Sequence, residues 1–235
     1  MKTCVINFAR GGWYSQGQRR LKESLNEANF SGDTLFFDNE QQIGAPSHQT
    51  CPYGFKPYAL ATAIKLGYTH VLWADASVWA IRNIQPMFEH IDKQGWMFFH
   101  NTCTGNWTSD ACLDVFHISR DKAMKMDMLM GICMGFNMTH PTTQQFFLEW
   151  LACAYDGKTF PGSWTNHNHE VSQDPRVYGH RHDQSVASIL ADKLGMSYLV
   201  PHETYFQYYE NKKKGIFDGD FSLIKPRVVM VAQGL

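Results

Sequence analysis

The stretch HVLWADASVW, residues 70–79, decides the fold class, because it is apolar for most of its length and then places the carboxylate of Asp75 near its end. An apolar run of this length predicts a buried strand. Open α/β sheets bind ligands just beyond the carboxyl ends of their strands. Asp75 is therefore a candidate site residue, with the alternative that it only ends the strand by bonding the backbone.

Strands and helices alternate on both sides of this stretch. Apolar and β-favouring runs predict strands, and apolar residues at spacings of three and four predict helices. We expect further strands at 3–8, 33–38, 95–100 and 226–235, and helices at 17–29, 53–67, 83–93, 139–155 and 183–194. This order predicts an α/β fold, a Rossmann-like single domain over residues 1–235 with a mainly parallel central sheet and helices on both faces.

Composition gives no support to several classes of protein. The chain has 235 residues, 44% of them hydrophobic, which is enough for a sizeable core, and its formal net charge is −1. That charge gives no basic surface for nucleic acid or an anionic membrane. No run approaches the roughly 20 apolar residues of a membrane span. We expect a cytoplasmic protein with no membrane span, whose six scattered cysteines are reduced.

Ser77 follows Asp75 by two residues and adds a second oxygen ligand at the end of the strand. Hard divalent cations prefer oxygen ligands and leave coordination positions open for phosphate and water. Asp75 and Ser77 together could therefore hold Mn²⁺ or Mg²⁺ against a diphosphate.

The segment YGFKPYALATAIKLGYTHVLWADASVWAIRNIQPMF, residues 53–88, resembles the core of GT-A fold nucleotide-sugar glycosyltransferases, nearest to the family 8 type. In that family, a helix opened by an aromatic and a basic residue precedes a strand that delivers an Asp-x-Asp motif. The resemblance matches Asp75 to the first Asp and Lys56 to a phosphate-contacting Arg. The motif is the variant Asp-Ala-Ser, because Ser77 follows Ala76 where the family has its second Asp. Serine is the weaker, neutral metal ligand.

The resemblance is looser in two other segments and fails in a third. It implies nucleotide binding near the first strand and donor-sugar or acceptor contacts in HRHDQSVASIL, residues 180–190. The Gly-x-x-Lys-Pro-Trp motif that the family carries near its carboxyl terminus is missing from this chain. His202 is therefore no more than a candidate metal ligand. The implied donor-binding residues are Phe8, Ala9, Arg10, Tyr14 (or Trp13 as the base-stacking ring), Lys56, Asp75, Ala76, Ser77 and Gln184.

The resemblance implies an enzyme that moves a hexosyl or pentosyl group from a nucleoside diphosphate sugar to a hydroxyl of a carbohydrate or other acceptor. Residues 1–100 would bind the nucleotide sugar, and residues 101–235 would form the acceptor side. Asp75, with the cation and with Arg10 and Lys56, would neutralise the diphosphate. Asp183 would be the base of an inverting transfer or would position the donor sugar in a retaining one.

Several alternatives remain open from the sequence. Asp183 could simply cap its helix, and Lys56 could be a solvated surface lysine. The H-x-H pairs could make the chain a metal-dependent hydrolase, through His167, His169, His180 and His182. Ser77 keeps open a catalytically inactive nucleotide-sugar binding domain. Trp107 and Trp164 lie in polar loops, where they could stack on a sugar.

Overall fold

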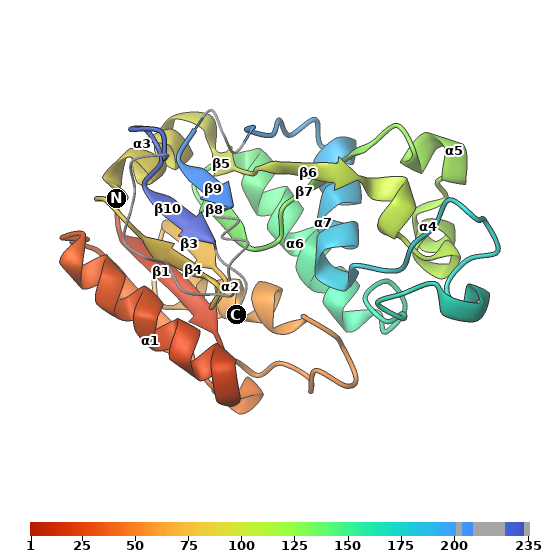
Figure 1. Ribbon diagram of the computed structural model, residues 1–235, viewed down its shortest axis with the longest axis horizontal. Helices are drawn as coiled ribbons and strands as arrows, with labels where there is room; N and C mark the ends of the chain where they lie inside the picture. Colours follow the sequence, from red (N-terminus) through yellow and green to blue (C-terminus); the bar gives the residue numbers. More distant parts are fainter. Residues whose placement is uncertain (201–203, 209–223, 233–235) are drawn as a thin grey trace.

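The computed structural model describes residues 1–200, 204–208 and 224–232 (Figure 1). Its strands are β1 (Thr3–Phe8), β2 (Asp33–Phe37), β3 (His70–Ala74), β4 (Val78–Ala80), β5 (Trp96–Met97), β6 (His100–Cys103), β7 (Asp127–Leu129), β8 (Cys133–Asn137), β9 (Phe206–Tyr208) and β10 (Met230–Ala232). Its α-helices are α1 (Gly12–Glu27), α2 (Phe55–Lys65), α3 (Gln85–Gln94), α4 (Asp110–Phe116), α5 (Arg120–Ala123), α6 (Pro141–Tyr155) and α7 (His182–Lys193). The 3₁₀ helices are η1 (Glu40–Ile43), η2 (Thr104–Trp107) and η3 (His167–His169).

A five-stranded sheet in the order β2-β1-β3-β8-β5 forms the centre of the fold. β1 pairs in parallel with β2 and β3, whereas β8 pairs antiparallel with both β3 and β5. Four strands of this sheet therefore run in one direction, with β8 reversed between them. The predicted α/β single domain with a mainly parallel sheet is confirmed, although the sequence did not predict β8.

Helices cover both faces of the sheet, as predicted. Alternate strand residues point to opposite faces. Val5 and Leu72 belong to the core cluster that includes residues of α1 and α3, whereas Ile6 and Trp73 belong to the cluster with α2, α6 and α7. Figure 1 shows α1 lying along the sheet, with α4 and α5 at the far end of the molecule. Both cores are apolar, and the strands between them are buried.

The start of α2 sets the position of Lys56. Pro57 lies in the first helical turn, where its missing N–H has no partner to lose, and Gly67 follows the helix with φ +82°. α2 packs against β1 and β3. Because the helix runs back along these strands, its first turn lies near their carboxyl ends, beside Asp75.

The predicted strand 70–79 is divided in the structure. β3 ends at Ala74, and the N–H of Val78 then donates to the Asp75 carbonyl at 2.9 Å in a turn. β4 belongs to a separate three-stranded sheet, β4-β10-β9, so the predicted closing strand lies outside the central sheet. The expected strand 95–100 is likewise divided, into β5 and the start of β6. Across residues 1–200, 204–208 and 224–232, no helix has the length and apolar character needed to cross a membrane.

Candidate active site

Asp75 lies directly after β3, where the chain turns away from the sheet. Its N–H donates to the carbonyl of Ile132 at 2.8 Å, and its Oδ1 accepts the indole N–H of Trp73 at 2.6 Å. The Asp75 side chain remains 26% exposed. Trp73, on β3, and Ile132, just before β8, therefore hold Asp75 in place. Its carboxylate still reaches solvent.

Lys56 lies between two of the predicted carboxylates. Its Nζ is 2.9 Å from Asp183 Oδ2 and 3.6 Å from Asp75 Oδ1, and it donates to the carbonyl of Gly131 at 2.7 Å. The Lys56 side chain is only 4% exposed. The alternative of a solvated surface lysine is therefore wrong, and the structure brings three predicted site residues into one cluster, which we call the Lys56 cluster (Lys56, Asp75 and Asp183).

The Lys56 cluster perturbs the pKa of both buried partners. Burial disfavours the charged lysine, but Asp183 and Asp75 together raise the pKa of Lys56 above its usual value. Burial raises the pKa of Asp183 to about 6, against the opposing effect of Lys56. A buried carboxylate whose pKa approaches neutrality is typical of functional sites, although structural ion pairs share this property.

Asp183 does not cap α7. The helix begins at His182, its N-cap is Arg181, and no side chain makes the capping hydrogen bond. The capping alternative for Asp183 is therefore wrong. Gln184, the next residue, lies beside Gly131, where an added Cβ would come within 3.3 Å of Gln184 Cβ and 3.4 Å of Asp183 Oδ2. The backbone at Gly131 thus approaches the cluster closely.

A pocket of about 530 Å³ opens beside the Lys56 cluster. It contains four of the predicted donor-binding residues, and its wall includes the stacked rings of Phe8 and Phe55, whose centroids are 4.5 Å apart. Flat aromatic walls suit a flat heterocyclic ligand. The lining residues are Phe8, Ala9, Arg10, Gly11, Tyr14, Glu40, His48, Tyr53 and Phe55.

Tyr53 connects the pocket with the Lys56 cluster. Its ring lines the pocket, and its centroid lies 5.5 Å from Lys56 Nζ. Sequence reasoning missed Tyr53, together with His48 and Phe55, as site residues. The available signal was the pair of aromatic residues, Tyr53 and Phe55, immediately before and at the start of α2.

Arg10 and Trp13 differ in how they relate to the pocket. Arg10 lines it, but its Nη1 is 3.1 Å from Glu40 Oε2, and the Arg10 side chain is 70% exposed. Its charge is thus partly compensated. Trp13 is 71% exposed and is not among the residues that line the pocket, whereas Tyr14 is. Of the two predicted base-stacking rings, the structure places Tyr14 at the pocket.

The predicted metal ligands match a hard cation in type but are few. Asp75 and Ser77 supply carboxylate and hydroxyl oxygens, which suit Mg²⁺ or Mn²⁺. Asp75 Oδ1, however, already accepts an N–H and lies 3.6 Å from the Lys56 ammonium. His202 lies outside the described residues. Within the described ranges, no three His, Cys, Asp or Glu side chains are grouped to hold a metal ion.

The histidines of the hydrolase alternative do not form one site. His180 is buried, with Nδ1 accepting the N–H of Ser109 and Nε2 donating to the carbonyl of Thr159. Burial lowers its pKa to about 3. His182 bonds the carbonyl of Phe160 through Nδ1. His180 thus has no free ring nitrogen for a metal. His167 and His169 lie apart from this pair on η3, and both are exposed.

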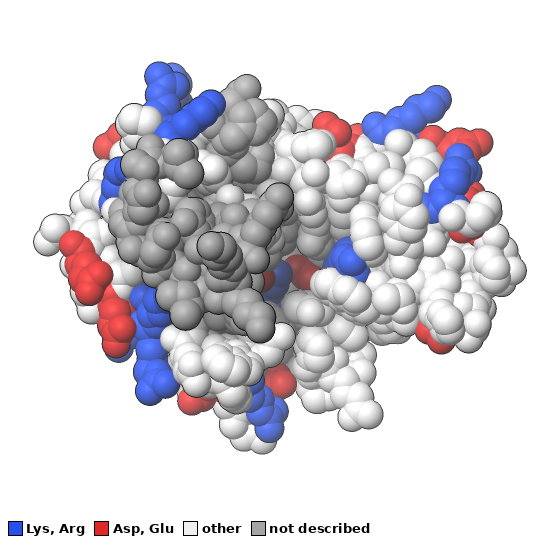
Figure 2. Space-filling view, viewed as in Figure 1, with Lys and Arg blue, Asp and Glu red and all other residues white. Residues whose placement is uncertain are grey.

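Figure 2 shows a hollow near the middle of one face, where acidic and basic atoms are both visible at the border of the grey region. Elsewhere on this face, most charged side chains lie along the rim. Charged groups of both signs therefore reach a concave part of the surface.

No protein-family model matches the chain, and no curated protein sequence matches it. Solved structures do match. The apo form of mouse xyloside xylosyltransferase 1 covers 99% of this chain and 98% of its own, at 11% identity and a TM-score of 0.50. A glycosyltransferase involved in the glycosylation of the major capsid of PBCV-1 covers 99% and 92%, at 10% identity and a TM-score of 0.53.

The chain also matches part of a larger protein. The match to the apo WbbM bifunctional glycosyltransferase includes 98% of this chain but only 45% of the WbbM chain, at 10% identity and a TM-score of 0.54. These likenesses show that the chain has the GT-A-like fold of glycosyltransferases. The predicted fold is therefore confirmed.

Proposed function

We propose that this chain is a glycosyltransferase that moves a sugar from a nucleoside diphosphate sugar to a hydroxyl group of an acceptor. The observation that carries the proposal is the position of the Lys56 cluster at the carboxyl end of β3, beside the aromatic pocket of about 530 Å³. In open α/β sheets this end of the strands is where ligands bind. The GT-A-like fold supports the same reaction class.

The nucleoside would occupy the aromatic pocket. Tyr14 and Phe8 would contact the base, while Ala9 and Arg10 would contact the ribose or the first phosphate. The diphosphate would then extend toward Asp75, Ala76 and Ser77 at the end of β3. Residues 1–100 would thus hold most of the donor, and residues 101–235 would supply Asp183, Gln184 and the acceptor side.

The departing diphosphate needs its charge neutralised. Asp75 and Ser77, completed by phosphate oxygens, would hold Mn²⁺ or Mg²⁺, which would supply that neutralisation. Arg10 would add a positive charge at the pocket. Lys56 is buried and bound to Gly131 and Asp183, so we propose that it orients Asp183 in place of the phosphate contact that the resemblance implies.

Asp183 would position the donor sugar. Its side chain is 4% exposed and its Oδ2 is in the ion pair with Lys56, which leaves little access for the bulky acceptor of a base-catalysed step. A buried carboxylate can still accept hydrogen bonds from sugar hydroxyl groups that enter the site. We therefore favour the positioning role over the general-base role.

The first test is thermal unfolding of the full chain with a panel of nucleoside diphosphates and nucleotide sugars, each with and without Mn²⁺. A ligand that binds only the folded state raises the midpoint. We expect one nucleotide class to raise it, and Asp75→Ala to reduce the rise. Asp114→Ala is the control, because Asp114 is exposed on α4.

Two results would overturn the proposal. Stabilisation by Zn²⁺ with none by any nucleotide would favour the hydrolase. Stabilisation by a nucleotide sugar without transfer to any acceptor or to water would favour the inactive binding domain, which Ser77 keeps as the second candidate.

A further inference from the structure

Arg181 is held between two tryptophan rings. Its guanidinium carbon lies 3.7 Å from the ring centroid of Trp107 and 3.6 Å from that of Trp164. Trp107 ends η2, and Trp164 lies in the long loop between α6 and α7. Both flat faces of the guanidinium are therefore covered by indole rings, which is a favourable cation–π arrangement, and its N–H groups are left to bond in its own plane.

The charge of Arg181 has little compensation. Among the residues that the structure describes, its side chain donates one hydrogen bond, from Nη1 to the carbonyl of Trp164 at 2.8 Å. In the part of the chain that the structure describes, no carboxylate lies within ion-pair distance of it. Burial lowers the pKa of Arg181 to about 10. A partly desolvated cation without a counter-ion is costly unless a ligand completes it.

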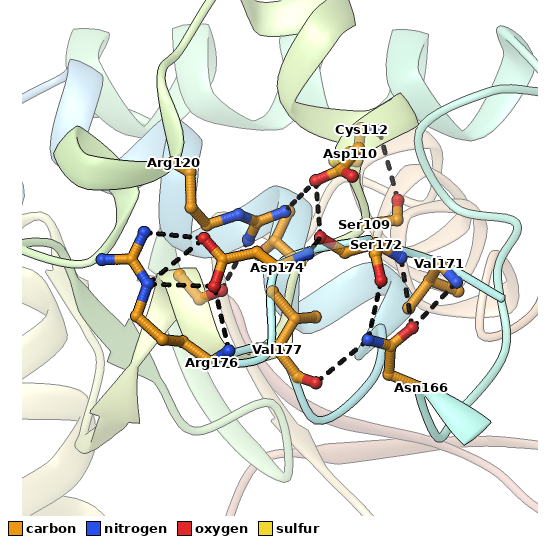
Figure 3. Close-up of polar contacts among 12 residues, drawn as sticks. Ser109, Asp110, Cys112, Arg120, Asn166, Val171, Ser172, Asp174, Arg176 and Val177 are labelled. Carbon is orange, nitrogen blue, oxygen red and sulfur yellow. Dashed lines mark hydrogen bonds and ion pairs between the residues drawn. The ribbon is translucent and has the colours of Figure 1, made fainter. Parts of the chain in front are cut away.

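The neighbouring arginines show what a structural arginine does here. Arg120 pairs with Asp110 at 2.6 Å, and Arg176 pairs with Asp174 at 2.6 Å (Figure 3). The first pair joins the starts of α5 and α4, and the second lies in the loop before α7, so both cations have carboxylate partners. Arg181 has no carboxylate partner among the described residues. A purely structural role in fixing the loop therefore does not explain why its charge is held between two rings.

The loop that carries Trp164 is held in place by its own polar contacts. The Asn166 side chain accepts the N–H groups of Val171 and Ser172 and donates to the carbonyls of Ser172 and Val177 (Figure 3). An added Cβ at Gly179 would lie 2.0 Å from the Trp164 carbonyl, so only glycine permits this backbone contact. The Trp164 ring is thus preorganised, which lowers the entropic cost of binding.

The tryptophan–arginine arrangement is continuous with the proposed donor site. The Trp164 ring stacks on His182 at 5.8 Å and lies 6.0 Å from the ring of Tyr53, which lines the pocket. Arg181 is also two residues before Asp183 in the chain. A ligand at Arg181 would therefore lie beside Trp164, whose ring is close to Tyr53 at the wall of the pocket.

We propose that Arg181, held between Trp107 and Trp164, binds an anionic group, a carboxylate or a phosphate, on the acceptor sugar. The inference rests on the proposed function, because it makes this place the acceptor side of a transferase. The planar fork of the guanidinium matches both anions through paired hydrogen bonds. Trp164 is 47% exposed beside the guanidinium, so a bound sugar could also contact its apolar atoms.

The test compares matched neutral and anionic probes on the full chain. Methyl β-D-glucuronide is measured against methyl β-D-glucoside, and glucose 6-phosphate against glucose, by NMR of the tryptophan indole N–H signals. We expect at least one anionic probe to bind about tenfold more tightly than its neutral partner and to shift the Trp107 and Trp164 signals. The arm that responds identifies the carboxylate or the phosphate.

Variants then assign the preference to the guanidinium. Arg181→Gln should abolish it, and Arg181→Lys should reduce it, because lysine keeps the charge but lacks the planar fork. Arg19→Gln, the same change at an exposed position of α1, should retain it. Equal affinity for neutral and anionic probes, or an unchanged preference in both Arg181 variants, would overturn the proposal.

Nucleotide binding by thermal shift, measured on the same samples, separates the two proposals. If nucleotides stabilise the chain but no anionic preference is found, only the acceptor proposal fails. If no nucleotide binds, the proposed function fails, whatever the result with the sugar probes.

Discussion

The ammonium of Lys56 lies 2.9 Å from Asp183 Oδ2 and 3.6 Å from Asp75 Oδ1. One buried cation thereby joins the first turn of α2 to the first turn of α7 and to the end of β3. With two carboxylates and one ammonium, the cluster is left with a formal negative charge when all three groups are ionised. Its electrostatics therefore depend on the protonation of Asp183.

Lys56→Met should lower the free energy of unfolding by about 3–5 kcal/mol at pH 7, because it leaves Asp183 buried without its cation. Urea unfolding at pH 7 measures the change. Lys65→Met, at the exposed end of α2, is the matched control and should stay within about 0.5 kcal/mol of the wild type. Equal losses in the two variants would show that the Lys56 pair adds nothing to stability.

The pH dependence of stability should reveal the titration of Asp183. Its pKa is raised from 3.8 to about 6 in the folded state, so between these values the folded chain binds more protons than the unfolded chain. The free energy of unfolding contributed by this group therefore falls as pH rises through the window, by on the order of 2–3 kcal/mol.

The free energy of unfolding is measured against pH for the wild type and for Asp183→Asn. The difference between the two curves isolates the contribution of Asp183, since the contributions of the other carboxylates cancel. Asp192→Asn, at an exposed position of the same helix, should leave the profile unchanged. A difference profile that is flat from pH 4 to 6 would mean that Asp183 titrates like a solvated aspartate.

Tyr14→Ala should weaken nucleoside diphosphate binding by about fivefold or more, because stacking of a base on an aromatic ring contributes about 1–3 kcal/mol. Trp13→Ala is a matched control at the adjacent position, since Trp13 is exposed and is not part of the described pocket lining. Titration calorimetry with the nucleotide that stabilises the chain gives both values. A larger loss in Trp13→Ala would place the base elsewhere.

Ser77→Asp should tighten Mn²⁺ binding in the presence of the nucleotide by about tenfold or more, because a second carboxylate adds a charged oxygen ligand beside Asp75. Electron paramagnetic resonance of free Mn²⁺ measures the affinity. Ser31→Asp adds the same charge at an exposed loop position and should have no effect. Unchanged Mn²⁺ affinity in Ser77→Asp would argue against a cation at this strand end.

Asn166→Ala should loosen the loop between α6 and α7, because two backbone N–H groups and two carbonyls lose their partner, at a cost of about 1–3 kcal/mol. Faster hydrogen exchange at Val171 and Ser172 is the expected signature. The exposed neighbour Thr165 provides the control, Thr165→Ala. Exchange rates that match the control would show that the loop is held by other contacts.

The sequence predicted the features that depend on local pattern. The apolar run before Asp75 and the spacing of Phe146 and Trp150 in α6 predicted elements that the structure contains. The approach of Lys56 to Asp183 could not be predicted from periodicity, because it depends on how α2 and α7 dock on the same face of the sheet. The place of Arg181 between two rings depends likewise on a loop without regular structure.

β8 escaped prediction for a different reason. Gly135 lies in its middle, and glycine is unfavourable in strands by propensity alone. The structure explains its presence, since an added Cβ would lie 2.4 Å from Ile91 Cδ1, where α3 packs on the sheet. Close helix packing thus outweighs strand propensity at this position.

The reversed position of β8 also affects the order in which the sheet can be completed. β5 pairs only with β8 in the described sheet, and one edge of β3 is covered only by β8. During synthesis from the amino terminus, β3 and β5 leave the ribosome before β8, so their open edges can recruit other chains until residue 137 has emerged.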